Sequence, residues 1–199
     1  MTSHIGMFHN SEPFDRKQLP VMQALAHYYT SDRVKEVLLP VISRNGDDKL
    51  SLRALDWLVT NYSKKNPIIY KVKPADMPEK FVNMYTEYKT WLWKYRRTHF
   101  DPFRRRHRLT FRVDGVEYTT TVGQLNFMYW ASKYGVLEYA RKHLDDIEKD
   151  HATVTKNKKD AKQTGKRKRR QLSALPCKKV LIFGEPVTVS FNPGGKESE

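Results

Sequence analysis

Six arginines between residues 96 and 108 are the side chains of this sequence best able to do chemistry. The segment reads RRTHFDPFRRRHR and contains no lysine and one acid, Asp101. Because a guanidinium is planar, it can hold two phosphate oxygens at once, stack on a base or pair with a carboxylate. A solvated charge run would mix both signs, so we expect a polyanion-binding segment, with protein carboxylates as the main alternative ligand. The six residues are Arg96, Arg97, Arg104, Arg105, Arg106 and Arg108.

The middle of this segment predicts a turn. Pro102 fixes its own φ, and the carboxylate of Asp101 can accept a hydrogen bond from a nearby backbone N–H. Phe100 and Phe103 stand on either side of the Asp-Pro pair. We expect both rings to anchor the turn to the core, which would leave the arginines on its two flanks.

The net charge of +15 is concentrated in two segments. Residues 94–108 hold seven Lys or Arg and one acid, residues 156–170 hold nine and one, and the rest of the chain is near +1. Localised basicity favours nucleic acid, because each neutralised phosphate releases a condensed counterion. The pair Lys64 and Lys65 is expected to assist, as is a cluster of nuclear-localisation type. That cluster consists of Lys166, Arg167, Lys168, Arg169 and Arg170.

The motifs of common enzyme classes are missing from the sequence. It contains no glycine-rich phosphate loop after a strand, no G-x-S-x-G and no H-E-x-x-H. His143, Asp146 and Asp150 could share a helix face, but a solvated acidic turn is the simpler interpretation than a metal site. The single cysteine, Cys177, excludes an internal disulfide and paired-cysteine zinc sites and favours a reducing compartment. We therefore expect no enzymatic activity, no cofactor and no metal.

Apolar residues recur at steps of three and four in five segments, which predicts five helices. The first two begin after Thr30 or Ser31 and after Ser51, and the others run over about 79–97, 122–134 and about 136–150. Pro40 is expected to end or kink the first helix. The aromatic stripe of the 79–97 helix is expected to face the core rather than to stack on bases.

Alternating residues predict strands between these helices. The strongest signal is RLTFRV and VEYTTT, joined by Asp114-Gly115, which is typical of a two-residue hairpin turn. A single strand is expected near 67–73, and a second hairpin around Gly184-Glu185-Pro186. The predicted fold class is α+β: a compact helical domain with a β-hairpin and a small sheet.

The predicted domain organisation has four parts. Residues 1–18 are expected to be a flexible arm, 19–150 the folded α+β domain, 151–175 a basic disordered linker, and 176–199 a docked C-terminal hairpin with a tail. No apolar run approaches the length of a transmembrane helix, so no membrane insertion is expected.

Three stretches together resemble a family of uncharacterised proteins of large DNA viruses of eukaryotes, such as algal and giant amoebal viruses. The resemblance implies a viral origin and a compact domain centred on these stretches, but no biochemical activity. They are LSLRALDWLVTNYSKKNPIIY (50–70), YKTWLWKYRRTHFDPFRRRHRLTF (88–111) and TTTVGQLNFMYWASKYGVLEYA (119–140).

The most distinctive positions of this resemblance lie in the third stretch. They include residues 119–122, Gln124, Asn126 and Trp130. Thr121 can cap a helix, and Gln124 three residues later completes a capping box. For Asn126 and Trp130, a buried polar contact and a recognition surface are both open.

These observations predict a non-enzymatic viral protein that binds nucleic acid, DNA rather than RNA, through arginine contacts to backbone phosphate. The expected location is the host nucleus or the viral factory, with the virion as a further possibility. The alternative is a minor structural protein of the capsid or core, whose arginines bind acidic surfaces of other virion proteins. A third interpretation is a nuclease or nucleotide-modifying enzyme without a recognisable motif.

Overall fold

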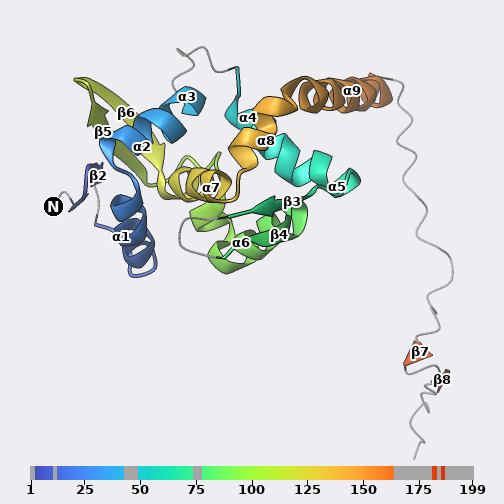
Figure 1. Cartoon of the computed structure of the whole chain (residues 1–199), viewed down its shortest axis with the longest axis horizontal. Helices are drawn as coiled ribbons and strands as arrows, with labels where there is room; N and C mark the ends of the chain where they lie inside the picture. The colour runs from blue at the N-terminus through green and yellow to red at the C-terminus, as the bar shows by residue number, and fades with distance from the viewer. Residues whose placement is uncertain are drawn as a thin grey trace, which may run out of the picture. The chain divides into compact units, whose positions relative to one another are not determined.

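The structure is a computed structural model that describes residues 3–10, 13–42, 49–73, 78–163, 181–182 and 185–186 (Figure 1). It mixes helices with small antiparallel sheets, which confirms the α+β class. The chain divides into two units, Met1–Asn157 and Lys158–Glu199. The arginine segment lies in the first unit.

The main sheet has four antiparallel strands in the order β1-β2-β5-β6. Strands β5 (Arg108–Val113) and β6 (Val116–Thr121) form the predicted hairpin. Its turn places Asp114 at φ 50° and Gly115 at φ 80°, the left-handed region that a two-residue turn of this type requires. The Asp-Gly signal is therefore confirmed.

Strands β1 (Ser3–Ile5) and β2 (Phe8–Asn10) correct the prediction of a flexible arm over 1–18. They pair with each other, and β2 pairs with β5 through His9 opposite Thr110. Phe8 is fully buried, with its ring centroid 5.5 Å from that of Phe111. One deeply buried aromatic side chain thus docks a hairpin whose strands have three residues each, too short to show alternation in the sequence.

Helix α1 (Gln18–Tyr28) follows, and the next helical segment runs from α2 (Ser31–Arg33) through a π-helix η1 (Val34–Leu38) into α3 (Leu39–Ile42). Thr30 caps this segment by accepting a hydrogen bond from the Arg33 N–H. Of the two outcomes expected at Pro40, an end or a kink, the end is wrong, because α3 continues through Pro40 to Ile42. A wider π turn immediately before Pro40 gives its ring room against the preceding turn.

The second helical segment begins at Ser51, which caps α4 (Leu52–Trp57) as predicted. It too contains a π-helix, η2 (Leu58–Tyr62), and ends in α5 (Ser63–Lys65).

A strand prediction and a helix prediction need correction in the next segment. Strand β3 (Ile69–Val72) confirms the single strand near 67–73, but β4 (Lys80–Asn83) pairs with it where the helix was expected to start. Helix α6 (Met84–Phe100) begins after Asn83, whose side chain caps it. The apolar residues of KFVN are compatible with a helix as well as with a strand. Pairing with β3 stabilises the strand.

Helix α7 (Val122–Lys133) is the centre of the core and packs against α1, α6, α8 and β6 (Figure 1). Most of its side chains are buried, including Leu125, Phe127, Met128 and Trp130.

The predicted helix over 136–150 is two helices, α8 (Val136–Lys142) and α9 (Leu144–Gln163). They are separated by His143, whose backbone leaves the helical region and whose ring stacks on Tyr139 at 4.3 Å. Because α9 continues to Gln163, the disordered linker does not begin at residue 151. The first half of α9 buries Ile147, and the Lys, Ala and Gln residues after residue 155 favour a helix by intrinsic propensity.

Strands β7 (Leu181–Ile182) and β8 (Glu185–Pro186) pair with each other, as the C-terminal hairpin predicts. The remaining residues after 163, including the cluster 166–170, lie outside the described residues.

Candidate nucleic-acid interface

The arginine segment forms the connection between α6 and β5. Arg96 interrupts the helical conformation of α6 at a kink, Arg97 lies in the last turn of this helix, and Arg108 is the first residue of β5. Arg96 has φ 55° and His107 has φ 54°, so a residue in the left-handed region stands near each end of the connection. Such conformations are costly for residues other than glycine and persist where surrounding contacts enforce them.

The turn between them is fixed by the contacts of Asp101. Its carboxylate accepts a hydrogen bond from the Phe103 N–H at 2.9 Å, and its carbonyl accepts one from the Arg104 N–H at 3.2 Å. A Cβ atom on Gly123 would lie 2.6 Å from the same carbonyl oxygen. The turn therefore presses on the start of α7, where only glycine fits.

Only one of the two phenylalanines anchors the turn. Phe100 is buried, with its ring 5.7 Å from the rings of both Phe127 and Trp130. Phe103 is 48% exposed, which corrects the expectation that both rings enter the core. The result is a rigid turn with one aromatic ring available at the surface.

The six arginines of the segment are accessible to solvent. Five are exposed and Arg104 is partly exposed. Within the described ranges, none of the six forms an ion pair, although other cation–carboxylate pairs are present. Their charge is therefore available to an external anion. His99 does not add to it at neutral pH, because burial, assisted by Arg104 and Lys17, lowers its pKa despite the opposing effect of Asp15.

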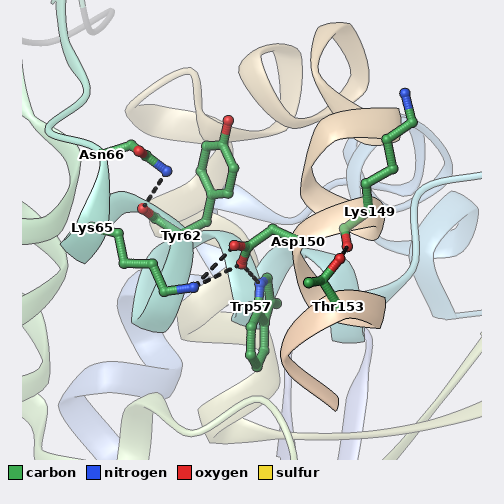
Figure 2. A network of polar contacts seen from close by, with 7 residues as sticks. All are labelled: Trp57, Tyr62, Lys65, Asn66, Lys149, Asp150 and Thr153. Atoms are coloured by element: carbon green, nitrogen blue, oxygen red, sulfur yellow. Dashed lines mark hydrogen bonds and ion pairs between the residues drawn. The ribbon is translucent and has the colours of Figure 1, made fainter. Parts of the chain in front are cut away.

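The two lysines predicted to assist differ from each other. Lys64 is exposed. Lys65 donates to the carboxylate of Asp150 at 2.9 Å, and the same carboxylate accepts a hydrogen bond from Trp57 Nε1 at 2.8 Å (Figure 2). This network links α9 to the segment α4–α5, so Lys65 has a structural role. Because its ammonium group is paired with Asp150, it is less available to phosphate than the Lys64 ammonium group.

The distinctive residues of α7 are structural. Asn126 is 2% exposed and donates to the His99 carbonyl at 2.8 Å, and Trp130 is fully buried. Burial excludes both from a recognition surface. Thr121 caps α7 as predicted, but Gln124 accepts a hydrogen bond from the Thr120 hydroxyl at 2.9 Å, and no return bond to the Thr121 N–H is present among the described contacts.

A half-open cavity of about 320 Å³ lies against the arginine segment. Sequence reasoning missed it, because its walls come from four elements. Burial, with a smaller contribution from Asp101, raises the pKa of Asp56 to about 6. The lining residues relevant here are Asp56, Thr60, Tyr88, Arg97, Asp101 and Phe103.

The described residues contain no cluster of three or more His, Cys, Asp or Glu side chains placed to hold a metal. Of the helical trio considered from the sequence, Asp150 is engaged with Trp57 and Lys65. No helix in the described part of the chain is long and apolar enough to cross a membrane.

Comparison with known proteins identifies relatives but no activity. A family of unknown function, DUF7197, matches residues 8–175. The uncharacterised protein L507 of Acanthamoeba polyphaga mimivirus is 33% identical over 160 residues, which cover 77% of this chain and 61% of that protein. The chain thus spans about three fifths of this relative's length, and no solved structure matches it. The relative comes from a large DNA virus, in agreement with the viral resemblance of the sequence, and the chain belongs to the DUF7197 family.

Proposed function

We propose that this protein binds nucleic acid without catalysing a reaction, using the turn between α6 and β5 to hold backbone phosphates. The observation that carries the proposal is a set of six accessible arginines, without ion pairs in the described chain, on and on either side of a turn that Asp101 and Gly123 fix in place. Because the backbone of the turn is fixed, only the arginine side chains have to be ordered on binding, and each planar guanidinium can hold two phosphate oxygens.

Contacts of this kind give affinity but no sequence information. The protein would act in the host nucleus or the viral factory, and its ligand would be DNA rather than RNA. Lys64 and the sequence cluster 166–170 would add non-specific attraction.

The test is fluorescence anisotropy of labelled duplex DNA and duplex RNA over a salt series. The wild-type protein is compared with a variant carrying Arg104→Ala, Arg105→Ala and Arg106→Ala. Three lost phosphate contacts should reduce the slope of log affinity against log salt by about two to three.

The matched control removes three exposed lysines elsewhere in the first unit: Lys89→Ala, Lys142→Ala and Lys149→Ala. It changes the net charge equally but leaves the turn intact. Equal slopes for the two variants would mean that charge alone matters, and the turn would not be the interface.

A structural role in the virion is the second candidate, supported by apolar side chains on the β3–β4 hairpin. Ile69 is 64% exposed and Phe81 is 74% exposed, and the register places both on the same face. If this face binds another virion protein, the pair Ile69→Ser and Phe81→Ser should release the protein from purified particles. Unchanged incorporation would reject this candidate.

A further inference from the structure

The cavity beside the arginine segment has the composition of a base-binding pocket rather than of a phosphate site. Extending the proposed function, on which this inference rests, we propose that the cavity receives one unstacked nucleic-acid base, guanine in preference to the others. The arginines would then hold the phosphates on either side of that base. A volume of about 320 Å³ is at the lower end of the range for small-ligand pockets, roughly 300–1,000 Å³.

The polar wall of the cavity offers hydrogen-bond acceptors. No described residue donates a hydrogen bond to the half-buried carboxylate of Asp56. One oxygen of Asp101 accepts the Phe103 N–H, which leaves its second oxygen available. A carboxylate accepts two donors side by side, and the Watson–Crick edge of guanine presents two adjacent donors, N1–H and the N2 amino group.

An aromatic ring stands at the same cavity. Phe103 is 48% exposed and makes no ring contact within the described chain. Tyr88, by contrast, is held by the rings of Phe100 and Trp130 and can serve only as a fixed wall. Stacking on a free aromatic ring is the usual way in which proteins hold unpaired bases.

Other ligands fit the cavity less well. Two carboxylates repel a phosphate, and a cationic side chain of a protein partner would meet Arg97 at the wall and the other arginines beside it. A base is uncharged, so it avoids both repulsions. The π-helix η2 supplies Thr60 to the wall, and such irregular turns are frequent at functional sites.

The protonation state of Asp56 agrees with this role at neutral pH. Its pKa of about 6 reflects burial and the neighbouring carboxylate of Asp101. Arg97 and Tyr88 also line the cavity, and the Tyr88 hydroxyl stays protonated because burial raises its pKa to about 12. The Asp56 carboxylate is therefore mostly ionised at pH 7.5 and able to accept both guanine donors.

The experiment compares single-stranded oligonucleotides of deoxythymidine that carry one central variable base. Anisotropy at pH 7.5 should show about tenfold tighter binding with a central guanine than with thymine, the effect of one good bidentate contact. Hypoxanthine, which lacks the N2 amino group, should fall between them. Asp56→Asn should remove the guanine preference, so that strands with a central guanine and a central thymine bind this variant with equal affinity. Asp145→Asn, on the exposed side of α9, removes the same charge and should keep the preference.

Phe103 provides the second variant and a rescue. Phe103→Leu should weaken binding of every single strand, and Phe103→Tyr should restore it. A wild-type protein that binds strands with guanine and thymine equally would overturn the base pocket but leave phosphate binding intact. If no strand and no duplex binds, the proposed function fails and the pocket proposal fails with it. A guanine preference retained in Asp56→Asn would overturn the assigned pocket.

Discussion

A half-buried aspartate is costly to keep ionised when no neighbouring group donates a hydrogen bond to it, and among the described residues none donates one to the Asp56 carboxylate. Burial, together with Asp101, raises its pKa from 3.8 to about 6. The folded state therefore binds its proton more tightly than the unfolded state does. The resulting stability is fully present below about pH 4 and is lost as the pH rises through about 6.

Asp56→Asn should consequently stabilise the protein at neutral pH. The gain should be about 1 kcal/mol at pH 8, after discounting the full linkage value for the partial contact of the side chain with water. It should shrink to nearly zero at pH 4, where the wild-type carboxyl group is also neutral. Urea unfolding at several pH values measures the difference, and a constant gain across this range would contradict the raised pKa.

The residues of the candidate site divide into those that local sequence predicts and those that it does not. The six arginines and the Asp101-Pro102 turn follow from residue type and adjacency, and the structure places them together on one connection. Asp56 and Asp101 are distant in the chain, and only the folded structure brings both to one cavity. Chain separation of this kind leaves no local signal.

At the scale of elements, the sequence predicts best where a turn or a cap determines the backbone. The Asp114-Gly115 hairpin and the caps at Thr30, Ser51 and Thr121 all form. Predictions fail where tertiary contacts decide. Strand β4 forms because β3 is beside it, and β1 and β2 form because Phe8 enters the core.

The N-terminal hairpin is accordingly expected to contribute strongly to stability. Phe8→Ala removes a fully buried ring that contacts Phe111 at 5.5 Å and Tyr29 at 6.0 Å. The loss should be about 3–5 kcal/mol in the free energy of unfolding, the usual cost of such a truncation. Chemical denaturation followed by circular dichroism measures it.

Ile69→Ala is the comparison for this variant, because Ile69 is 64% exposed on β3. It should change the free energy of unfolding by less than about 0.5 kcal/mol. A similarly small effect of Phe8→Ala would mean that the N-terminal hairpin does not dock on the sheet, and the arm prediction would be reinstated.

At the scale of the whole molecule, positive charge has two separate sources. The arginine segment 96–108 belongs to the unit Met1–Asn157. The cluster 166–170 belongs to the sequence of the unit Lys158–Glu199. The arginine segment is part of the folded surface that the structure describes, whereas the cluster 166–170 is known from the sequence alone. If both bind phosphate independently, their effects on the salt dependence of binding should add.

Changing Lys166, Arg167, Lys168, Arg169 and Arg170 to Gln should therefore lower the salt slope for duplex DNA by up to about four to five. The same change should leave the urea midpoint of the first unit unaltered, because these residues lie outside it. Combined with the triple arginine variant, the two slope reductions should sum. If the cluster variant alone abolishes binding, the arginine segment contributes no phosphate contact of its own. Its arginines would then be better explained by an acidic protein partner.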